Sequence, residues 1–288
     1  MDYLLLFSAA VFSGATAIFG NLFNCKNVSV KNAASLYNLL LAVSVLVGWG
    51  IFYLCDLSFE PGVLLYSLGY GVCYVTSVVC LLYAMKHGPV ALSSLIMNFS
   101  LIVVTVWGMI FWNSKINAVV LSGLCLVVIS LLLCLYQKKS SQEKLSAKWF
   151  FYISIAFFGN TGCVILQKTQ QMQYHNQHGN MLMFFAMIPA VAMCALLYLR
   201  APVQEPKKVL CSSGFFPVLA GTLNLLLNLF VILLAAGPLS PSLIYPTTAV
   251  GGIAVTSVLS VILFKERLSL RQWFGVAVGG VAIALLSI

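Results

Sequence analysis

Long apolar runs, each about twenty residues, alternate with short polar segments along the whole chain. A helix of about 20 apolar residues crosses the hydrocarbon core of a bilayer, which is roughly 30 Å thick. The pattern therefore predicts membrane-spanning helices joined by short loops. We expect ten of them, over residues 3–23, 32–55, 62–84, 89–111, 116–136, 149–168, 179–199, 214–236, 238–264 and 271–288.

Composition strengthens this reading. Of the 288 residues, 61% are hydrophobic and 7% are charged, whereas soluble domains carry about 25% charged residues. So few charges cannot cover a globular surface with groups that water solvates. The N-terminus also lacks a basic segment and a small-residue cleavage site, so the first run is expected to be a retained helix. We predict an all-α polytopic membrane protein.

One polar segment is longer than the others and divides the chain. It runs from Gln137 to Lys148 and follows the fifth expected helix. We therefore predict a first five-helix repeat over residues 1–136, a linker over 137–148, and a second five-helix repeat over 149–288.

Basic residues fall mostly in alternate loops, as topology signals do. Thirteen of the fifteen lie after the first, third, fifth, seventh or ninth helix: Lys26, Lys31, Lys86, Lys138, Lys139, Lys144, Lys148, Arg200, Lys207, Lys208, Lys265, Arg267 and Arg271. Cytoplasmic loops carry such an excess, so we expect a cytoplasmic linker and both termini outside, in a bacterial plasma membrane. A net charge of +9 spread over such loops indicates contact with anionic lipid and no nucleic-acid partner.

The two halves share a local pattern. Gly88-Pro89 and Gly237-Pro238 stand at equivalent junctions between helices, and each is followed by an apolar helix, a short basic turn and a glycine-containing helix. An odd number of helices per half places the second copy upside down relative to the first. Inverted repeats of this kind occur in alternating-access transporters, whose substrate binds near mid-depth between the repeats.

The stretch from Gly237 to Leu286 resembles the C-terminal half of EamA-like members of the drug/metabolite transporter superfamily. The matching elements are the Gly-Pro turn, Pro246, the turn "FKERL" and the glycine-containing last helix, and "AFFGNTG" (Ala156 to Gly162) resembles the opening of the family's second repeat. The resemblance implies ten transmembrane helices as two inverted five-helix repeats. It also implies transport of small metabolites through a cavity lined by the first, third, fourth, sixth, eighth and ninth helices.

Polar but uncharged residues inside the expected helices are the candidate ligand contacts. No Asp or Glu falls inside an expected helix, which argues against an embedded carboxylate as a proton relay. The predicted substrate-binding residues are Tyr70, Tyr74, Asn98, Asn160, Asn224, Asn228, Tyr245 and Thr248, with Pro246 as a gating kink. All lie in helices that the resemblance assigns to the cavity.

Spacing and burial cost support this choice. Tyr70 and Tyr74, like Asn224 and Asn228, stand one helical turn apart and so share a face. Pro246 frees a backbone carbonyl one turn earlier, and in hydrocarbon such a group must face protein or a watered cavity. The alternatives are hydrogen bonds that hold helices together and a proline kink without a role in transport.

The function predicted from these features is transport of an amino acid, an amine or a similar neutral, zwitterionic or cationic solute. A flippase for a lipid-linked substrate is the first alternative, and a membrane enzyme that modifies lipid is a weaker one because the acids and ligands for such chemistry are lacking. The pair His175 and His178 is expected to be a solvated loop. We expect no cofactor and no metal, a small-molecule substrate, a surrounding bilayer, and a monomer or homodimer.

The charge pattern predicts the sidedness of the chain. In a variant without native cysteines, a membrane-impermeant maleimide added to intact cells should label Asp2→Cys and leave Gln142→Cys unlabelled. Labelling of Gln142→Cys and not of Asp2→Cys would show that the chain has the opposite orientation.

Overall fold

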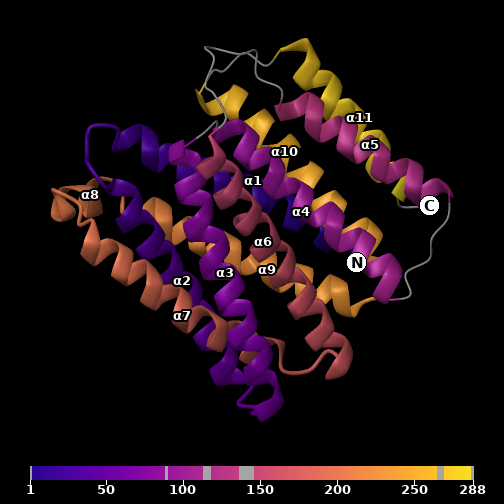
Figure 1. Ribbon diagram of the computed structural model, residues 1–288, viewed down its shortest axis with the longest axis horizontal. Helices are drawn as coiled ribbons and strands as arrows, with labels where there is room; N and C mark the ends of the chain where they lie inside the picture. The colour runs from indigo at the N-terminus through magenta and orange to yellow at the C-terminus, as the bar shows by residue number, and fades with distance from the viewer. Residues whose placement is uncertain (1, 88–89, 113–117, 136–145, 265–268, 287–288) are drawn as a thin grey trace.

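A computed structural model of the chain is entirely helical in the part that it describes, which is residues 2–87, 90–112, 118–135, 146–264 and 269–286. Eleven helices lie in this part (Figure 1): α1 (Asp2–Lys26), α2 (Ala33–Cys55), α3 (Pro61–His87), α4 (Val90–Phe111), α5 (Ala118–Leu135), α6 (Ala147–Gln173), α7 (Gly179–Arg200), α8 (Pro206–Ser213), α9 (Phe215–Ala236), α10 (Pro241–Phe264) and α11 (Leu270–Leu286).

Ten of these helices coincide with the ten expected segments, and α8 is an addition. It is a short helix that begins at Pro206, where a missing N–H costs nothing. Several boundaries also differ from the prediction by a few residues, and two of these differences concern the site described below. α6 continues to Gln173, beyond the expected end at residue 168, and α10 begins at Pro241, so that Pro238 precedes the helix. The predicted linker 137–148 lies outside the described residues except at its last three positions.

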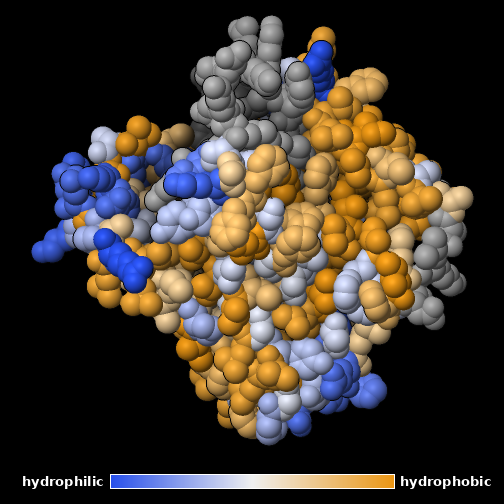
Figure 2. Space-filling model, in the orientation of Figure 1, coloured by the Kyte–Doolittle hydropathy of each residue, from blue (hydrophilic) through white to orange (hydrophobic). Residues whose placement is uncertain are grey.

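Length and polarity of the helices agree with a multi-pass membrane protein. Seven helices of the described part are long and apolar enough to cross a bilayer, and three shorter apolar segments lie in α4, α5 and α11. The space-filling view shows an apolar surface over most of one face, with hydrophilic residues gathered at the left and at the bottom (Figure 2). An apolar belt between polar ends is the surface that a bilayer requires.

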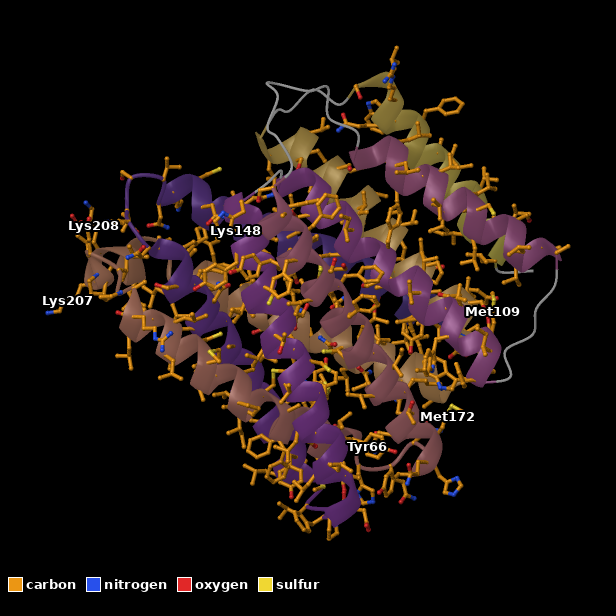
Figure 3. The ribbon with its side chains drawn as sticks, viewed as in Figure 1. Tyr66, Met109, Lys148, Met172, Lys207 and Lys208 are labelled. Atoms are coloured by element: carbon orange, nitrogen blue, oxygen red, sulfur yellow. The ribbon has the colours of Figure 1, made fainter. Side chains whose placement is uncertain are left out.

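The two polar ends are built from different loops. At one end, here called the α8 end, the α1–α2 turn meets the chain around α8, where Asn27 Nδ2 donates to Ser213 Oγ (2.8 Å). The Lys26 ammonium lies 4.9 Å from the centre of the Phe216 ring at the same end. Lys148, Lys207 and Lys208 lie toward this end in Figure 3, and Tyr66, Met109 and Met172 lie toward the other, here called the far end.

Contacts between helices come in matched pairs. If α1 to α5 are matched in order with α6, α7, α9, α10 and α11, then the packing of α3 on α6 has its counterpart in α9 on α1. In the same way α3 on α7 corresponds to α9 on α2, and α4 on α6 to α10 on α1. Three further contacts, α2 with α7, α4 with α10 and α5 with α11, each join a helix to its own match. The α5–α11 pair lies at the upper right of Figure 1 and contacts α10.

The ends of α2 and α7 repeat the same backbone geometry. Their N-caps, Asn32 (φ 62°, ψ 20°) and His178 (φ 59°, ψ 20°), are both left-handed. Their C-caps, Asp56 (φ −137°, ψ 75°) and Ala201 (φ −137°, ψ 69°), also agree. Each N-cap side chain reaches the segment that follows the other helix: Asn32 Nδ2 donates to the Pro202 carbonyl (3.2 Å), and His178 Nδ1 lies 2.9 Å from Ser58 Oγ.

Glycines let the backbones of neighbouring helices touch. A Cβ added at Gly159 of α6 would lie 2.8 Å from the Cys73 carbonyl oxygen of α3. A Cβ added at Gly71 of α3 would lie 2.9 Å from the Ala186 carbonyl oxygen of α7. Small residues at such positions allow the close packing on which association of helices in lipid depends. α3 is therefore held against both of its main neighbours by backbone contact.

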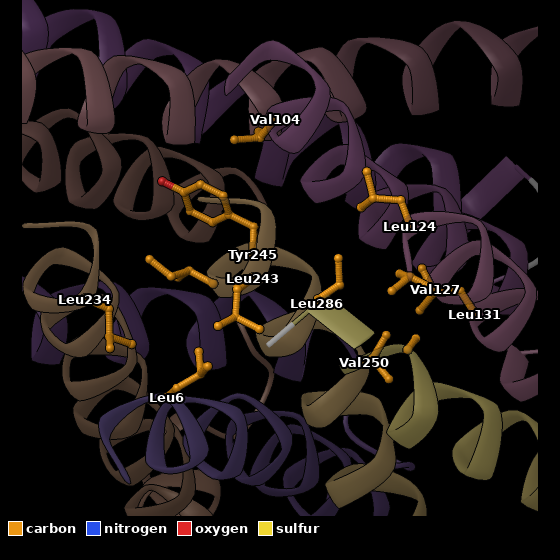
Figure 4. Close-up of a cluster of buried hydrophobic side chains, with 12 residues drawn as sticks. Leu6, Val104, Leu124, Val127, Leu131, Leu234, Leu243, Tyr245, Val250 and Leu286 are labelled. Carbon is orange, nitrogen blue, oxygen red and sulfur yellow. The ribbon is translucent and has the colours of Figure 1, made fainter. Parts of the chain in front are cut away.

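Apolar side chains form two main clusters. The first joins α1, α4, α5, α10 and α11 with the last turns of α9, and includes Val104, Leu131, Leu234 and Tyr245. Figure 4 shows Tyr245 of this cluster beside Leu243. The second joins α2, α3, α6, α7 and α9, and includes Trp49 and Tyr70 among several methionines. α6 and α9 contribute to both clusters and so lie between them.

The close approach of α3 and α6 can be tested with a minimal substitution. Gly159→Ala should lower the stability of the protein in detergent by about 1–3 kcal/mol, because a methyl group forced into a packed contact displaces a backbone. Gly280→Ala is the matched control, since nothing lies within 4 Å of the added Cβ there. Thermal unfolding followed by tryptophan fluorescence should separate the two, and equal midpoints would contradict the packing described here.

Candidate functional site

The two tyrosines predicted on α3 lie together. The rings of Tyr70 and Tyr74 are stacked, with centroids 6.4 Å apart and an interplanar angle of 13°. Tyr70 is buried in the second cluster and Tyr74 packs against it, and the Cys163 thiol of α6 donates to the Tyr70 carbonyl (3.6 Å). The rest of this stripe binds neighbouring helices: Tyr66 hydroxyl donates to the Gln173 side chain, and Ser77 Oγ donates to the Ala156 carbonyl (2.9 Å).

The two asparagines predicted on α9 form a pair. Asn228 Nδ2 donates to the backbone carbonyl of Asn224 (2.8 Å) and lies 3.2 Å from its Oδ1. Both side chains are half-buried. Within the described residues no hydrogen bond uses Asn228 Oδ1 or the side-chain nitrogen Nδ2 of Asn224. The pair therefore keeps one acceptor and one donor for a polar ligand or water.

On α6, Asn160 bridges to the first half of the chain. Its Nδ2 donates to Ser100 Oγ of α4 at 2.6 Å. In this conformation Asn160 thus forms a hydrogen bond between two helices, which is the alternative to a ligand contact considered above. Asn98 lies in α4, and its side chain is outside the part of the chain that the structure describes.

The predicted break at Pro246 lies inside a continuous helix, α10. Tyr245 is buried in the first cluster, and Thr248 Oγ1 donates to the Ile244 carbonyl of its own helix (2.8 Å). Thr247 Oγ1 and Ser242 Oγ, five residues apart on either side of Pro246, are buried without a hydrogen-bond partner among the described residues. A buried hydroxyl group without a hydrogen-bond partner costs free energy in an apolar interior. The first turns of α10 therefore carry two hydroxyl groups that can still form hydrogen bonds, close to Pro246, which has no N–H.

The predicted residues do not form one contact cluster in this structure. Tyr70 and Tyr74 belong to the second cluster and Tyr245 to the first. Within the described residues no hydrogen bond or ring contact links the two groups. α6 and α9, which carry Asn160 and the asparagine pair, are the helices that run between them. Sequence periodicity predicts which face of a helix is polar, and only packing decides which faces meet.

Two cavities lie elsewhere. One, of about 250 Å³, is at the α8 end between α2, α3 and α7, and its polar lining includes Asn38, Tyr83 and Arg200. The other is a groove of about 670 Å³ between α3 and α6, lined by apolar residues such as Phe150, Phe151 and Phe158. Neither of these two is lined by a predicted site residue.

A polar group on the last turns of α6 was missed by the sequence analysis. Gln167, Gln170 and Gln171 are buried, and Lys168 is half-buried. The Lys168 ammonium donates to the Ala235 carbonyl in the last turn of α9, and Gln171 Nε2 donates to the Ile232 carbonyl (2.9 Å). The expected helix ended where the polar residues began. Their spacing of three and four could have indicated that the helix continues with this face buried.

Potential metal ligands in the described part of the chain do not gather into a site. No group of three or more potential ligands lies together in the described part of the chain. His178, expected in a solvated loop, stands at the N-cap position of α7 without a side-chain capping hydrogen bond, and its Nδ1 contacts Ser58 Oγ. This contact ties the α6–α7 turn to the α2–α3 turn at the far end.

Comparison with known proteins identifies the class. The sequence model of the EamA-like transporter family matches residues 1–136, the half in which the sequence resemblance is less marked. No curated protein matches the sequence. Of the solved structures, 29 chains match, and one crystal structure of a protein superposes with a TM-score of 0.71 at 12% identity, over 99% of this chain and 95% of its own. That likeness shows a shared fold.

The family match confirms the resemblance predicted from sequence. Residues 1–136 match the EamA-like transporter family, which belongs to the drug/metabolite transporter superfamily, and the long apolar helices of the described part are those of a multi-pass membrane protein.

Proposed function

We propose that the protein carries a small solute across the membrane by alternating access between two inverted five-helix halves, residues 1–136 and 149–288. The observation that carries this proposal is the matched pairing of contacts between the halves. Exchange of the halves converts the major contacts into one another or into themselves, as expected for two repeats related by a two-fold axis in the membrane plane. In transporters built this way the binding site lies between the repeats.

The equivalent ends of α2 and α7 support the same symmetry. Asn32 is at the α8 end and His178 at the far end, yet they hold the same left-handed N-cap and reach equivalent segments of the opposite half. Identical caps at opposite ends of the molecule are what an inverted repeat produces. The α8 end carries Lys26, Arg200, Lys207 and Lys208, so the positive-inside rule assigns it to the cytoplasm.

The two ends differ in closure, which supports one of the two access states. At the far end, α6 is tied to α9 by Lys168 and Gln171, and to α3 through Gln173 and Tyr66. At the α8 end, a cavity of about 250 Å³ separates α2 from α3. We assign this structure to a state closed toward the outside, with the solute site between α3, α6, α9 and α10.

Polar contacts in this site should be required for transport. Asn228→Ala and Tyr74→Ala should each reduce the initial rate of uptake by roughly tenfold or more, because a lost polar contact in a buried site costs about 1–3 kcal/mol. Uptake would be measured in proteoliposomes against a panel of amino acids, amines, nucleosides and sugars.

Matched controls lie on the same two helices. Thr222 of α9 and Leu65 of α3 are exposed on the surface of the helix bundle, so Thr222→Ala and Leu65→Ala should transport normally. Normal uptake by both Asn228→Ala and Tyr74→Ala would remove these residues from the site.

Alternating access further requires that α6 and α9 part at the far end. In a variant without native cysteines, spin labels on Gln171→Cys and Ile232→Cys should therefore show a short and a longer distance by pulsed electron paramagnetic resonance in proteoliposomes. Labels on Thr222→Cys and Ile232→Cys, both on α9, should show one distance. A single short distance between the labels on α6 and α9 under all conditions would show that this end does not open.

A lipid flippase is the second candidate, because the groove between α3 and α6 is open at the surface and lined by phenylalanines. An acyl chain would fit such a surface. Introduction of a charge with Phe158→Asp should then stop movement of a fluorescent phospholipid between leaflets, whereas uptake of a soluble substrate should tolerate the change.

A further inference from the structure

Lys168 is a cation within a membrane-spanning helix, in the last turns of α6. Ionisable residues at such positions mark ligand or ion sites. A lysine near a helix end ordinarily extends its ammonium to the surface. Here the side chain is half-buried, and its ammonium turns to the Ala235 carbonyl, which is itself buried.

Among the described residues this ammonium has no acidic partner. The acidic side chains of the described residues are Asp2, Asp56, Glu60 and Glu205, and the one ion pair in the described part joins Glu205 to Lys208 (2.8 Å). A neutral carbonyl oxygen satisfies one N–H of the ammonium and leaves its charge uncompensated. An uncompensated charge in a poorly solvated position favours binding of an anion.

The position of Lys168 connects it to the proposed solute site. On α6 it stands one turn after Val164, which packs against the first cluster, and two turns after Asn160. On α9 its partner Ala235 stands two turns after Asn228, on the same face. Two turns of helix span roughly 11 Å. Lys168 therefore lies about this distance from Asn160 and Asn228 along the helix axes, toward the far end.

Acceptors without donors lie beside it. Gln171 Nε2 donates to the Ile232 carbonyl, Gln170 Nε2 donates to the Gln177 carbonyl (2.8 Å), and these bonds orient the two amides. Their Oε1 atoms are buried without a partner among the described residues, and the side chains are 2% and 0% exposed. A buried carbonyl oxygen of this kind is matched by an N–H or O–H group.

We propose that Lys168 selects a carboxylate-bearing solute, with Gln171 accepting a hydrogen bond from an amino or hydroxyl group beside that carboxylate. Charge and acceptor lie one turn apart on α6, which suits the two groups of an α-amino or α-hydroxy acid. This inference rests on the proposed transport function and restricts its substrates to acids. The Ala235 carbonyl holds the ammonium until the solute replaces it.

A purely structural role for Lys168 gives a different expectation. Lysine side chains can cap the last carbonyls of a helix, and Lys168 would then only stabilise the end of α9. Lys168→Gln separates the two roles, because its amide can still donate to the Ala235 carbonyl and carries no charge. Lys168→Arg keeps both the charge and the donors.

The test compares acids with amides of equal size on the purified full-length protein. Lactate with lactamide, alanine with alaninamide and mandelate with mandelamide are the probe pairs, and binding is measured by isothermal calorimetry. We expect wild type and Lys168→Arg to bind an acid of the panel at least tenfold more tightly than its amide. Lys168→Gln should lose that preference with an unchanged melting temperature.

An acid preference retained in Lys168→Gln, or its absence from the wild type, overturns the proposal. If Lys168→Gln does not fold, the wild type is acylated with an amine-reactive ester and Lys168 modification is followed by mass spectrometry. Protection by the acid and not by its amide supports the proposal, and equal protection overturns it.

Uptake in proteoliposomes distinguishes this inference from the transport function. Acids that bind through Lys168 and are not taken up would overturn transport while the ligand class stands. Uptake of amines or uncharged solutes that Lys168→Gln leaves unchanged would support the transport function and overturn the proposed ligand class.

Discussion

Contact of backbone with backbone between α3, α6 and α7 is the constraint on which the rest of this structure depends. In the hydrocarbon of a bilayer no hydrophobic driving force brings helices together, so close packing and interhelical hydrogen bonds must hold them. Gly159 and Gly71 allow both in one place, because α3 approaches α6 and α7 closely enough for the Cys163 thiol to reach the Tyr70 carbonyl. This packing is one of the contacts that join the two halves.

Polar groups in such a protein have two uses, and their hydrogen bonds separate them. Ser77, with its carbonyl partner on a neighbouring helix, is satisfied and serves assembly. Thr247, Gln170 and Gln171 keep buried atoms without partners in the described part of the chain, and the asparagine pair of α9 keeps open capacity. Because an apolar interior penalises polar groups without partners, these are the groups that we expect to form hydrogen bonds with a transported solute or with water.

Much of the fold was predictable because a bilayer imposes a simple rule on sequence. An apolar run of sufficient length must become a helix, since only a helix satisfies its own backbone in lipid. The ten expected segments coincide with helices for this reason. The prediction was wrong at polar positions: α8 was not expected, and the expected end of α6 excluded Gln170 and Gln171, which are buried. Hydropathy alone cannot distinguish a polar residue that faces water from one that faces another helix.

The sequence by itself determined where the apolar helices lie and which loops carry the basic residues, and it predicts the polar face of each helix and a division at Gln137–Lys148. These follow from local composition and from the helical repeat. Tertiary structure alone decided which faces meet: Asn160 with Ser100, Tyr245 within a cluster apart from Tyr70, and Lys168 on the last turn of α9. Those contacts depend on how closely two backbones approach, and glycines and side chains on both helices together set that distance.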